Sequence, residues 1–235
     1  MSISKIEISD SRASENTTLN PRLTPETVTG LAEAWSKTRR LRIEDALDPE
    51  LADALVDLAA SHPFSFFERD PSTAGGSEIR CVFWRQVHPL PDPDTEAPLA
   101  LHRLRRFIDV DLPALASAIT GQSLRAAAGD GVAIDFYTRG SYLDAHTDQG
   151  MDRLIAYVVG LTAETWPEED GGHLEFLGPD EHTVLDRIAP GYGSLDLFTV
   201  YPLTRPHRVP LLKRPVTRLS INGWLTGELK GPGEP

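Results

Sequence analysis

The second half of the chain is divided into short segments of β-branched and aromatic residues, and this division restricts the possible folds more than any other feature. From about residue 125 onward the segments follow one another closely, with Gly, Pro and Asp clusters between them. Short strands at such spacing are typical of a sandwich or a closed double sheet. The expected strands lie at residues 132–138, 141–148, 153–162, 172–178, 193–201 and 217–225. An earlier segment, residues 78–87, is expected to join the same sheet.

The first half has helical spacing instead. A helix-start signal at Thr24, Pro25 and Glu26 predicts a helix over residues 24–37. Apolar residues recur on one face of residues 48–63, and residues 101–120 are also expected to be helical. Pro113 should kink or split the third helix, because proline lacks a backbone donor. We therefore predict an α+β fold in which N-terminal helices pack on a double-stranded β-helix, a jelly-roll or cupin-like barrel.

The chain is expected to form a single domain over residues 23–228, with a helical part (23–125) followed by the barrel core (126–228). At 235 residues it is long enough for one substantial core. Residues 1–22 and 229–235 are polar, lack periodicity, and are expected to be disordered tails.

Charge and cysteine content exclude several classes of protein. A net charge of -12 argues against nucleic-acid binding, which needs a basic surface. Cys81 is the only cysteine, so neither an intramolecular disulfide nor a cysteine-based zinc site can form. No apolar stretch approaches the roughly 20 residues of a membrane helix, and the polar start does not resemble a signal peptide. We expect a soluble, cytoplasmic protein.

Two of the expected strands place polar residues on one face. Alternate side chains of a strand share a face. In residues 141–148 that face is expected to carry Tyr142, Asp144, His146 and Asp148, with Leu143 pointing the other way. If apolar faces are covered by helices or a second sheet, polar faces turn into the barrel, where unpaired charges are costly.

The last strand shows the same division. Its polar face is expected to carry Arg218, Ser220, Asn222 and Trp224. Leu219, Ile221 and Leu225 occupy the opposite face. An interior that contains His, Asp and Arg side chains is expected to bind something.

The spacing of the histidines and acids suggests a metal site. His146 and Asp148 form an H-x-D pair on one strand, His207 follows on a much later strand, and Arg218 lies on the last. Two neutral imidazoles and a carboxylate suit non-haem iron(II) and leave three coordination positions open. An H-x-D pair alone could equally be an exposed loop pair. A rival pair, His173 and Glu175, also has i, i+2 spacing.

In these motifs the sequence resembles the iron(II)/2-oxoglutarate-dependent oxygenase superfamily, and within it the prolyl-hydroxylase-like branch. The resemblance covers about the last half of the chain. The matching residues are Tyr137 and Gly140, His146 and Asp148, Arg153, Gly171 and Gly172, Pro190 and Gly191, His207 and Val209, Arg218 and Ser220, and Trp224.

The resemblance implies roles for these positions. His146, Asp148 and His207 would bind Fe(II), and Arg218 would pair with the distal carboxylate of 2-oxoglutarate, helped by Ser220. An Arg fork suits a carboxylate because it can bind both oxygens. Tyr137 would lie near the co-substrate, although a cross-strand packing role is the alternative. Trp224 would form a wall of the pocket or part of the core.

The sequence departs from the branch at one position. The strand after the metal residues often supplies a tyrosine to the co-substrate carboxylate, and the aligned residue here is Gly160. Tyr157 is nearby but has the opposite strand parity. Asp148 argues against the related halogenases, in which a small residue leaves room for halide.

The reaction implied by the resemblance uses O2 to convert 2-oxoglutarate to succinate and CO2 while hydroxylating an unactivated C–H bond. The expected substrate is amino-acid-like, either a small molecule or a residue of a peptide or protein. Rival readings are a cupin-like metal-dependent hydrolase or isomerase and a non-catalytic binding module of the same fold. Arg218 favours the oxygenase, because the rivals do not need a carboxylate anchor.

Four residues are candidates for recognising an anionic group of the substrate. Arg80, Trp84 and Arg85 lie on the strand that precedes the barrel core, and Arg139 lies in a turn expected to be near the iron. Exposed strand arginines more often serve solubility. The sequence does not indicate the oligomeric state.

Overall fold

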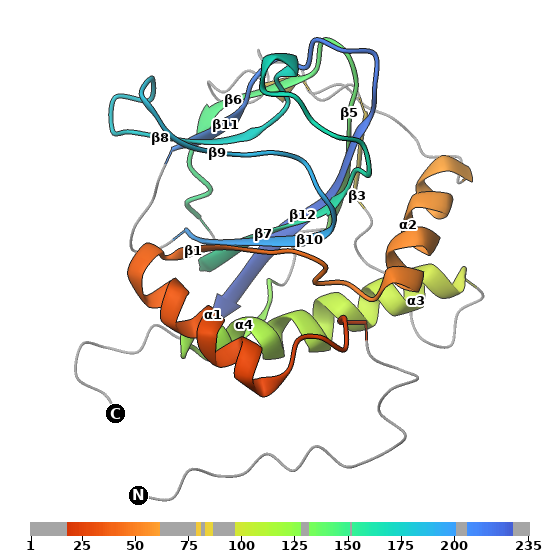
Figure 1. Ribbon diagram of the computed structural model, residues 1–235, viewed down its shortest axis with the longest axis vertical. Coiled ribbons are helices and arrows are strands. Elements are labelled where there is room, and N and C mark those ends of the chain that lie inside the picture. Colours follow the sequence, from red (N-terminus) through yellow and green to blue (C-terminus); the bar gives the residue numbers. More distant parts are fainter. Residues whose placement is uncertain are drawn as a thin grey trace, which may run out of the picture.

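A computed structural model describes residues 18–61, 79–80, 83–86, 97–127, 132–150, 152–200 and 206–227. Helices lie on one side of an antiparallel sheet, and a second sheet lies on its other side (Figure 1). This is the predicted α+β arrangement. The cytoplasmic location and the domain boundaries stay predictions.

The predicted helices are present. They are α1 (Pro25–Thr38), α2 (Pro49–Ser61), α3 (Leu99–Arg106) and α4 (Leu112–Thr120). The Thr24 side chain caps α1 by accepting a hydrogen bond from the backbone N–H of Thr27, as its start signal predicted.

The interruption expected at Pro113 takes the form of a π-helix. Residues Phe107–Asp111 join α3 to α4, and the backbone N–H of Leu112 donates to the carbonyl of Phe107, five residues earlier. The wider turn ends just before the proline, which occupies the first turn of α4. Proline is tolerated there because a first-turn N–H needs no helical partner. The helical segment is therefore divided into two, as predicted.

Two antiparallel sheets form the barrel in the described part of the chain. The major, seven-stranded sheet has the order β1-β10-β7-β12-β5-β3, with β4 also paired to β12. The minor, five-stranded sheet has the order β2-β6-β11-β8-β9. The major strands are β1 (Arg40–Ile43), β3 (Phe83–Gln86), β4 (Leu124–Ala126), β5 (Ala133–Tyr137), β7 (Arg153–Leu161), β10 (Tyr192–Thr199) and β12 (Arg218–Gly227). The minor strands are β2 (Ile79–Arg80), β6 (Tyr142–His146), β8 (Leu174–Leu177), β9 (Val184–Ile188) and β11 (His207–Val209).

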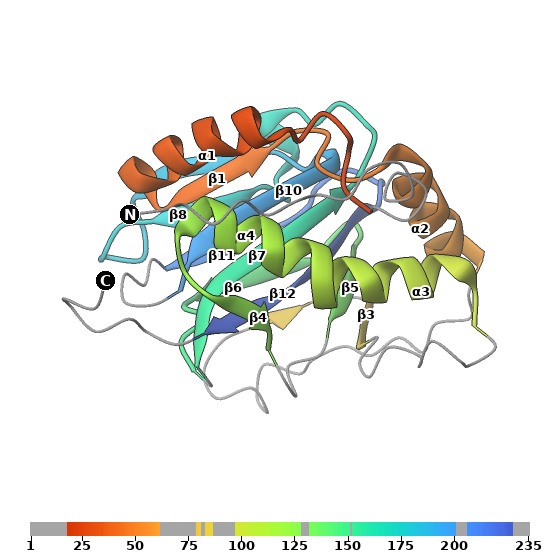
Figure 2. The ribbon, with the colours of Figure 1, turned by 90° about the horizontal axis from the view of Figure 1, so that it is seen from below.

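The main hydrophobic core lies between the helices and the outer face of the major sheet, a layering visible in Figure 2. Leu219, Ile221 and Leu225 of β12 belong to this core. Their burial confirms the predicted apolar face of this strand. The alternate residues of β12 therefore face the minor sheet across the barrel interior.

The segment at residues 78–87 does not form one strand of one sheet, as was predicted. Its first part, β2, pairs with β6 of the minor sheet, whereas β3 pairs with β5 of the major sheet. The segment thus crosses between the two sheets. Strands β1, β4 and β9 were not predicted, because they are short or lie at sheet edges.

The predicted face of β6 is also wrong in part. His207 pairs with His146, but Val209 pairs with Leu143, so β6 has one more residue than β11 between these two pairs. Such a bulge reverses the alternation of side chains. Leu143 consequently shares a face with His146 and packs against the cluster that contains Val209. Asp144, expected on that face, is exposed.

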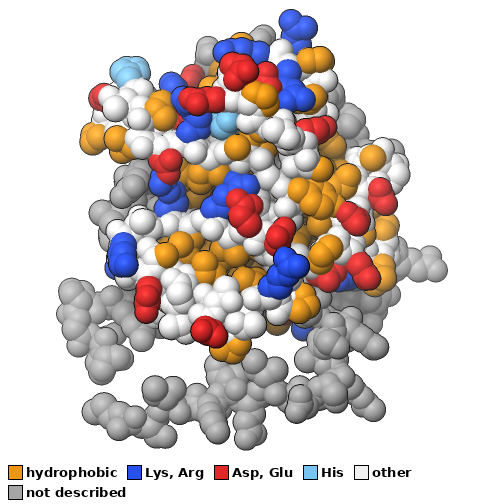
Figure 3. Space-filling model, viewed as in Figure 1, with side chains coloured by type: hydrophobic (Ala, Val, Ile, Leu, Met, Phe, Trp, Pro, Cys, Tyr) orange, Lys and Arg blue, Asp and Glu red, His pale blue; other side chains and the backbone are white. Residues whose placement is uncertain are grey.

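Residues 18–20 were expected to belong to a disordered tail, but they are packed against the fold. The Thr18 hydroxyl donates to Asp111 Oδ2 at 2.7 Å, and Leu19 forms a β-bridge with Leu47. Residues 21 and 22 of that tail are described as well, whereas residues 1–17 and the C-terminal tail lie outside the described residues. On the face drawn in Figure 3, basic and acidic side chains are interspersed with hydrophobic ones. None of the described helices has the length and apolar character needed to cross a membrane.

Candidate metal centre and co-substrate pocket

Three side chains of types that bind metals converge in the barrel interior. His146 ends β6, Asp148 lies two residues further on, and His207 begins β11 opposite His146. One donor atom from each residue lies within 4.8 Å of the others, and no other such group occurs in the described part of the chain. We call these three residues the metal triad. The predicted H-x-D and distant histidine are thus brought together.

Hydrogen bonding prepares the triad for a cation. His146 Nδ1 lies 2.8 Å from the carbonyl oxygen of Asp144, which can only accept, so Nδ1 carries the proton and Nε2 has a free lone pair. That Nε2 lies 3.5 Å from Asp148 Oδ1, and His207 Nε2 lies 3.4 Å from Asp148 Oδ2. A backbone carbonyl that fixes the tautomer of a histidine in this way is usual at metal sites.

The acid of the triad remains ionised. Burial alone would raise the pKa of Asp148, but its contacts with the rings of His146 and His207 outweigh burial and hold this pKa well below its usual range. Phe198 packs edge-on against His207, with ring centroids 5.1 Å apart. Two imidazoles and one carboxylate in an aromatic-walled site form the facial arrangement that suits Fe(II).

Arg218 lies inside the barrel, as predicted. Its residue is 6 % exposed, and its guanidinium carbon lies 4.8 Å from the centre of the Tyr137 ring. Tyr137 is its pairing partner on β5, so the ring both packs in the core and supports the guanidinium. A cross-strand packing role for Tyr137 and a place next to the co-substrate site therefore do not exclude each other.

Two buried polar atoms near Arg218 have no partner. Arg218 Nε and Ser220 Oγ are buried, and neither makes a hydrogen bond within the described structure. Leaving such groups unpaired costs about 1–3 kcal/mol each, and more for a charged group. Both side chains line the same small cavity, together with Gly160, Leu174, Ile188 and Asp196. A donor pair of this kind fits the distal carboxylate of 2-oxoglutarate.

Gly160 stands where the prolyl-hydroxylase-like branch often has a tyrosine, and the structure leaves no room for a side chain at this position. A Cβ on Gly160 would lie 2.4 Å from the carbonyl oxygen of Gly191 and 2.6 Å from Ser194 Oγ. The loop around Gly191 therefore occupies the space that a side chain would need. Tyr157 is buried in the core beneath the helices, as its parity predicted, and does not replace the missing tyrosine.

Two buried acids in the barrel were not predicted. Asp135 pairs with Ser220 across β5 and β12, and burial raises its pKa to about 6, although Arg218 and a hydrogen bond from Asn222 oppose the shift. Asp196 is buried on β10, and burial raises its pKa to about 7 despite the nearby Arg42. Strand parity could have revealed Asp196, because Leu195 and Leu197 on either side of it face the main core.

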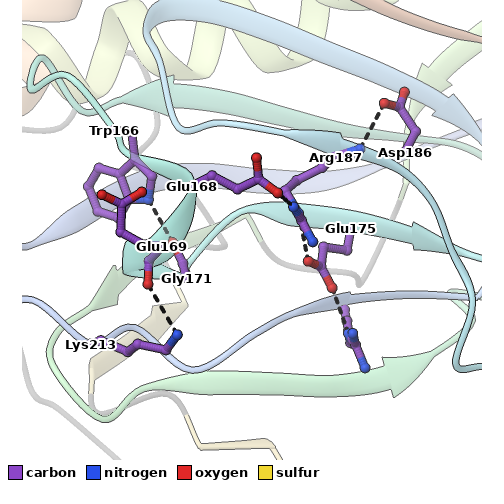
Figure 4. A network of polar contacts seen from close by, with 9 residues as sticks. Trp166, Glu168, Glu169, Gly171, Glu175, Asp186, Arg187 and Lys213 are labelled. Atoms are coloured by element: carbon purple, nitrogen blue, oxygen red, sulfur yellow. Dashed lines mark hydrogen bonds and ion pairs between the residues drawn. The ribbon is translucent and has the colours of Figure 1, made fainter.

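The rival pair, His173 and Glu175, does not form a metal site. Both carboxylate oxygens of Glu175 accept hydrogen bonds, one from Arg187 Nε and one from Arg208 Nε, each at 2.8 Å. Figure 4 shows Glu175 within this polar network on the minor sheet. The carboxylate is therefore already neutralised by two arginines.

The four candidate substrate residues stay predictions. The side chains of Arg80, Trp84 and Arg85 lie outside the described residues. Arg139 is exposed in the turn before β6, whereas His146 ends that strand. A role for Arg139 near the iron stays a prediction.

A different arginine lies beside the triad. Arg153 begins β7, and its guanidinium carbon lies 3.5 Å from the centre of the Trp224 ring. Arg153 Nη1 is 3.5 Å from the backbone carbonyl of Asp148. Arg153 and Trp224 each belong to a motif of the sequence, but only the fold shows that the two side chains stack on each other.

Comparisons with known proteins agree with this geometry. Residues 132–226 match the model of the 2OG-Fe(II) oxygenase superfamily. A segment of 101 residues is 34% identical to prolyl 3-hydroxylase sudestada1 of Drosophila melanogaster and covers 39% of this chain. That segment spans only 19% of the fly protein.

Solved structures share the fold at low sequence identity. A Pseudomonas putida prolyl-4-hydroxylase is 19% identical with a TM-score of 0.59, and the match covers 86% of this chain and 99% of that one. The α-ketoglutarate-dependent epimerase SnoN from nogalamycin biosynthesis is 14% identical with a TM-score of 0.61, covering 87% of this chain and 82% of that one. The family match over residues 132–226 agrees with the sequence motifs, and the solved structures share the fold.

Proposed function

We propose that this protein is an Fe(II)- and 2-oxoglutarate-dependent dioxygenase that hydroxylates an unactivated C–H bond of an amino-acid-like substrate. The observation that carries the proposal is the pairing of two sites in one barrel. The metal triad supplies two imidazoles and a carboxylate, and the unpartnered Arg218 Nε and Ser220 Oγ line a cavity in the same interior.

Each group has a distinct task. The metal triad would hold Fe(II), which with bound 2-oxoglutarate and O2 supplies the oxidising chemistry. Arg218 and Ser220 would bind the distal carboxylate, and the Tyr137 ring would keep the guanidinium in place. The aromatic wall at Phe198 would exclude water from the metal.

The substrate would meet Arg153 and Trp224. Their stack lies against the backbone of Asp148, so it forms one edge of the metal site. A flat indole with a cation above it offers an apolar surface and nearby N–H donors, which suits a ring or short side chain next to a peptide carbonyl. A prolyl or similar residue of a peptide or protein is the substrate class we favour, and the sequence similarity to a prolyl 3-hydroxylase supports this choice.

The test is product analysis with labelled oxygen. The Fe(II)-loaded protein is incubated with 2-oxoglutarate, 18O2 and a panel of free amino acids and proline-containing peptides, with Asp148→Ala as the control. The proposal expects one product to gain a single 18O atom and an equal amount of succinate to form. A cupin-like hydrolase or isomerase would change a substrate without consuming 2-oxoglutarate, and a binding module would change none; either result overturns the proposal.

A further inference from the structure

One side chain of the co-substrate cavity has the wrong charge for a pocket that binds a dianion. Asp196 lines this cavity together with Arg218 and Ser220. It is 5 % exposed, and its Oδ1 atom is buried with no hydrogen-bond partner within the described structure. Neither the metal triad nor the proposed carboxylate site uses this acid.

The fold fixes Asp196 on the interior face. On β10 Asp196 pairs with Val158 of β7. Ser194, the preceding residue of β10 on the same face, pairs with Gly160 of β7. Gly160 in turn pairs with Ser220 of β12. Since interior positions repeat every second residue, Asp196 lies alongside the cavity beyond Ser220, on the opposite side of β7.

The nearest cation does not neutralise Asp196 fully. Arg42 Nη1 is 3.5 Å from Asp196 Oδ2, which is long for a hydrogen bond. The same guanidinium donates to the carbonyl of Ala189 at 2.7 Å, to Glu44 Oε1 at 2.6 Å and to Ser194 Oγ at 3.1 Å. Its donors are therefore mostly engaged elsewhere, and Asp196 Oδ1 remains without a donor.

Charged groups reach this region from several elements of the fold. Strand β1 contributes Arg40 and Arg42, and Glu44 follows that strand directly. Arg218 comes from β12, and two further acids come from β5 (Asp135) and β9 (Asp186). Asp186 is paired with Arg40, and Glu175 of β8 faces outward to Arg187 and Arg208. Burial is the largest influence and raises the pKa of Asp196 to about 7, while Arg42, Arg218 and Arg40 oppose the rise and Glu44 adds to it.

We propose that Asp196 is a positioning residue that takes up a proton from solvent when 2-oxoglutarate enters and then donates a hydrogen bond to it from the protonated carboxyl. This inference rests on the proposed function. A second anion in the cavity disfavours the ionised form of Asp196, and protonation turns a repelling oxygen into a donor. The proton balance is simple, because one solvent proton is bound as the dianion binds and is released when it leaves.

The coupling of proton uptake to 2-oxoglutarate binding determines how the affinity for 2-oxoglutarate changes with pH. Below about pH 7 the acid is already protonated in the free protein, so binding should not depend on pH there. Above that value binding must bring a proton, so affinity falls as pH rises, at most about tenfold per pH unit for one proton. Asp135 titrates lower, with its pKa raised to about 6, and serves as the matched control.

The experiment is anaerobic calorimetry of the Fe(II)-loaded full chain with 2-oxoglutarate in buffers of different ionisation enthalpy. At about pH 8 the wild type and Asp135→Asn should each take up close to one proton, whereas Asp196→Asn should take up none. The dissociation constant of Asp196→Asn should not vary with pH, because its amide donates without titrating. Asp196→Ala, which has no donor, should bind about tenfold more weakly at pH 6.5.

The possible failures can be told apart. If the wild type takes up no proton, or if Asp196→Asn still takes one up, the inference about Asp196 is wrong while the proposed function stands. If 2-oxoglutarate does not bind at either pH, the proposed function fails and this inference fails with it. Thermal melting of each variant checks that its fold is intact. An Asp196→Asn protein that melts as the wild type does yet keeps the wild-type pH dependence counts against the inference.

Discussion

Replacement of Arg218 by alanine tests the co-substrate site through binding alone. The guanidinium is buried and stacked on Tyr137, and its Nε has no hydrogen-bond partner among the described residues. Its removal would leave the distal carboxylate of 2-oxoglutarate buried without a counter-charge. Losing one member of such a buried charged pair costs about 2–5 kcal/mol.

That range corresponds to a dissociation constant for 2-oxoglutarate that rises roughly 30-fold to several thousand-fold. Arg218→Lys keeps the charge but loses the planar fork and the stacking, so we expect an intermediate loss. Fe(II) affinity should stay unchanged, because Arg218 does not belong to the metal triad. The measurement is anaerobic titration of the Fe(II)-loaded protein with 2-oxoglutarate, followed by its metal-to-ligand charge-transfer absorbance.

Arg214→Ala is the matched control, since Arg214 also lies over an aromatic ring, at 5.6 Å from the centre of Trp166, but does not line the cavity. It should bind 2-oxoglutarate as the wild type does. The reasoning is refuted if Arg218→Ala binds the co-substrate within about threefold of the wild type. Joint loss of iron and 2-oxoglutarate affinity would equally show that the two sites are not separate.

Three further outcomes are expected. Alanine at any one position of the metal triad should abolish turnover and most Fe(II) binding with little change in circular dichroism; full succinate production by one variant would remove that residue from the triad. Gly160→Ala should destabilise the fold by about 1–3 kcal/mol in denaturant unfolding, because its Cβ meets Gly191 at 2.4 Å. Gly30→Ala in α1 has nothing within 4 Å and should be neutral or stabilising; equal effects of the two would contradict the steric argument. Saturating Fe(II) should raise the melting temperature of the wild type by several degrees over the chelated protein, with no such rise in Asp148→Ala.

The regular strands allowed much of the interior to be predicted. Strand β12 has unbroken alternation, so parity alone placed Arg218 and Ser220 inside the barrel and Leu219 beneath the helices. Tyr157 was assigned to the opposite face by the same rule, and its burial in the main core agrees. Pattern reasoning succeeds here because one strand face must be covered by apolar side chains.

Irregular features escaped prediction for equally physical reasons. The bulge in β6 reversed the positions of Leu143 and Asp144, and nothing in the local sequence marks an extra residue that only the pairing with β11 reveals. The division of residues 78–87 between two sheets depends on partners far along the chain. Arg42 of β1 reaches Asp196 across 154 residues, a contact that no local pattern can indicate.

The stacking of Arg153 on Trp224 is a further example, because each residue fits its own strand pattern and only tertiary pairing brings the two together. Asp148 follows His146, the last residue of the bulged strand β6, by two positions. Its carboxylate nevertheless contacts His207. The H-x-D motif could therefore be recognised from the sequence, whereas its geometry depends on the pairing of β6 with β11.

The most direct test of the account is a single-turnover measurement of succinate. The anaerobic complex of protein, Fe(II) and 2-oxoglutarate is mixed with oxygenated buffer together with a substrate found in the labelled-oxygen panel, and succinate is quantified per metal site. The account predicts about one succinate per iron-loaded site, dependent on O2 and absent in Asp148→Ala. Intact 2-oxoglutarate after complete reaction of the substrate would contradict it.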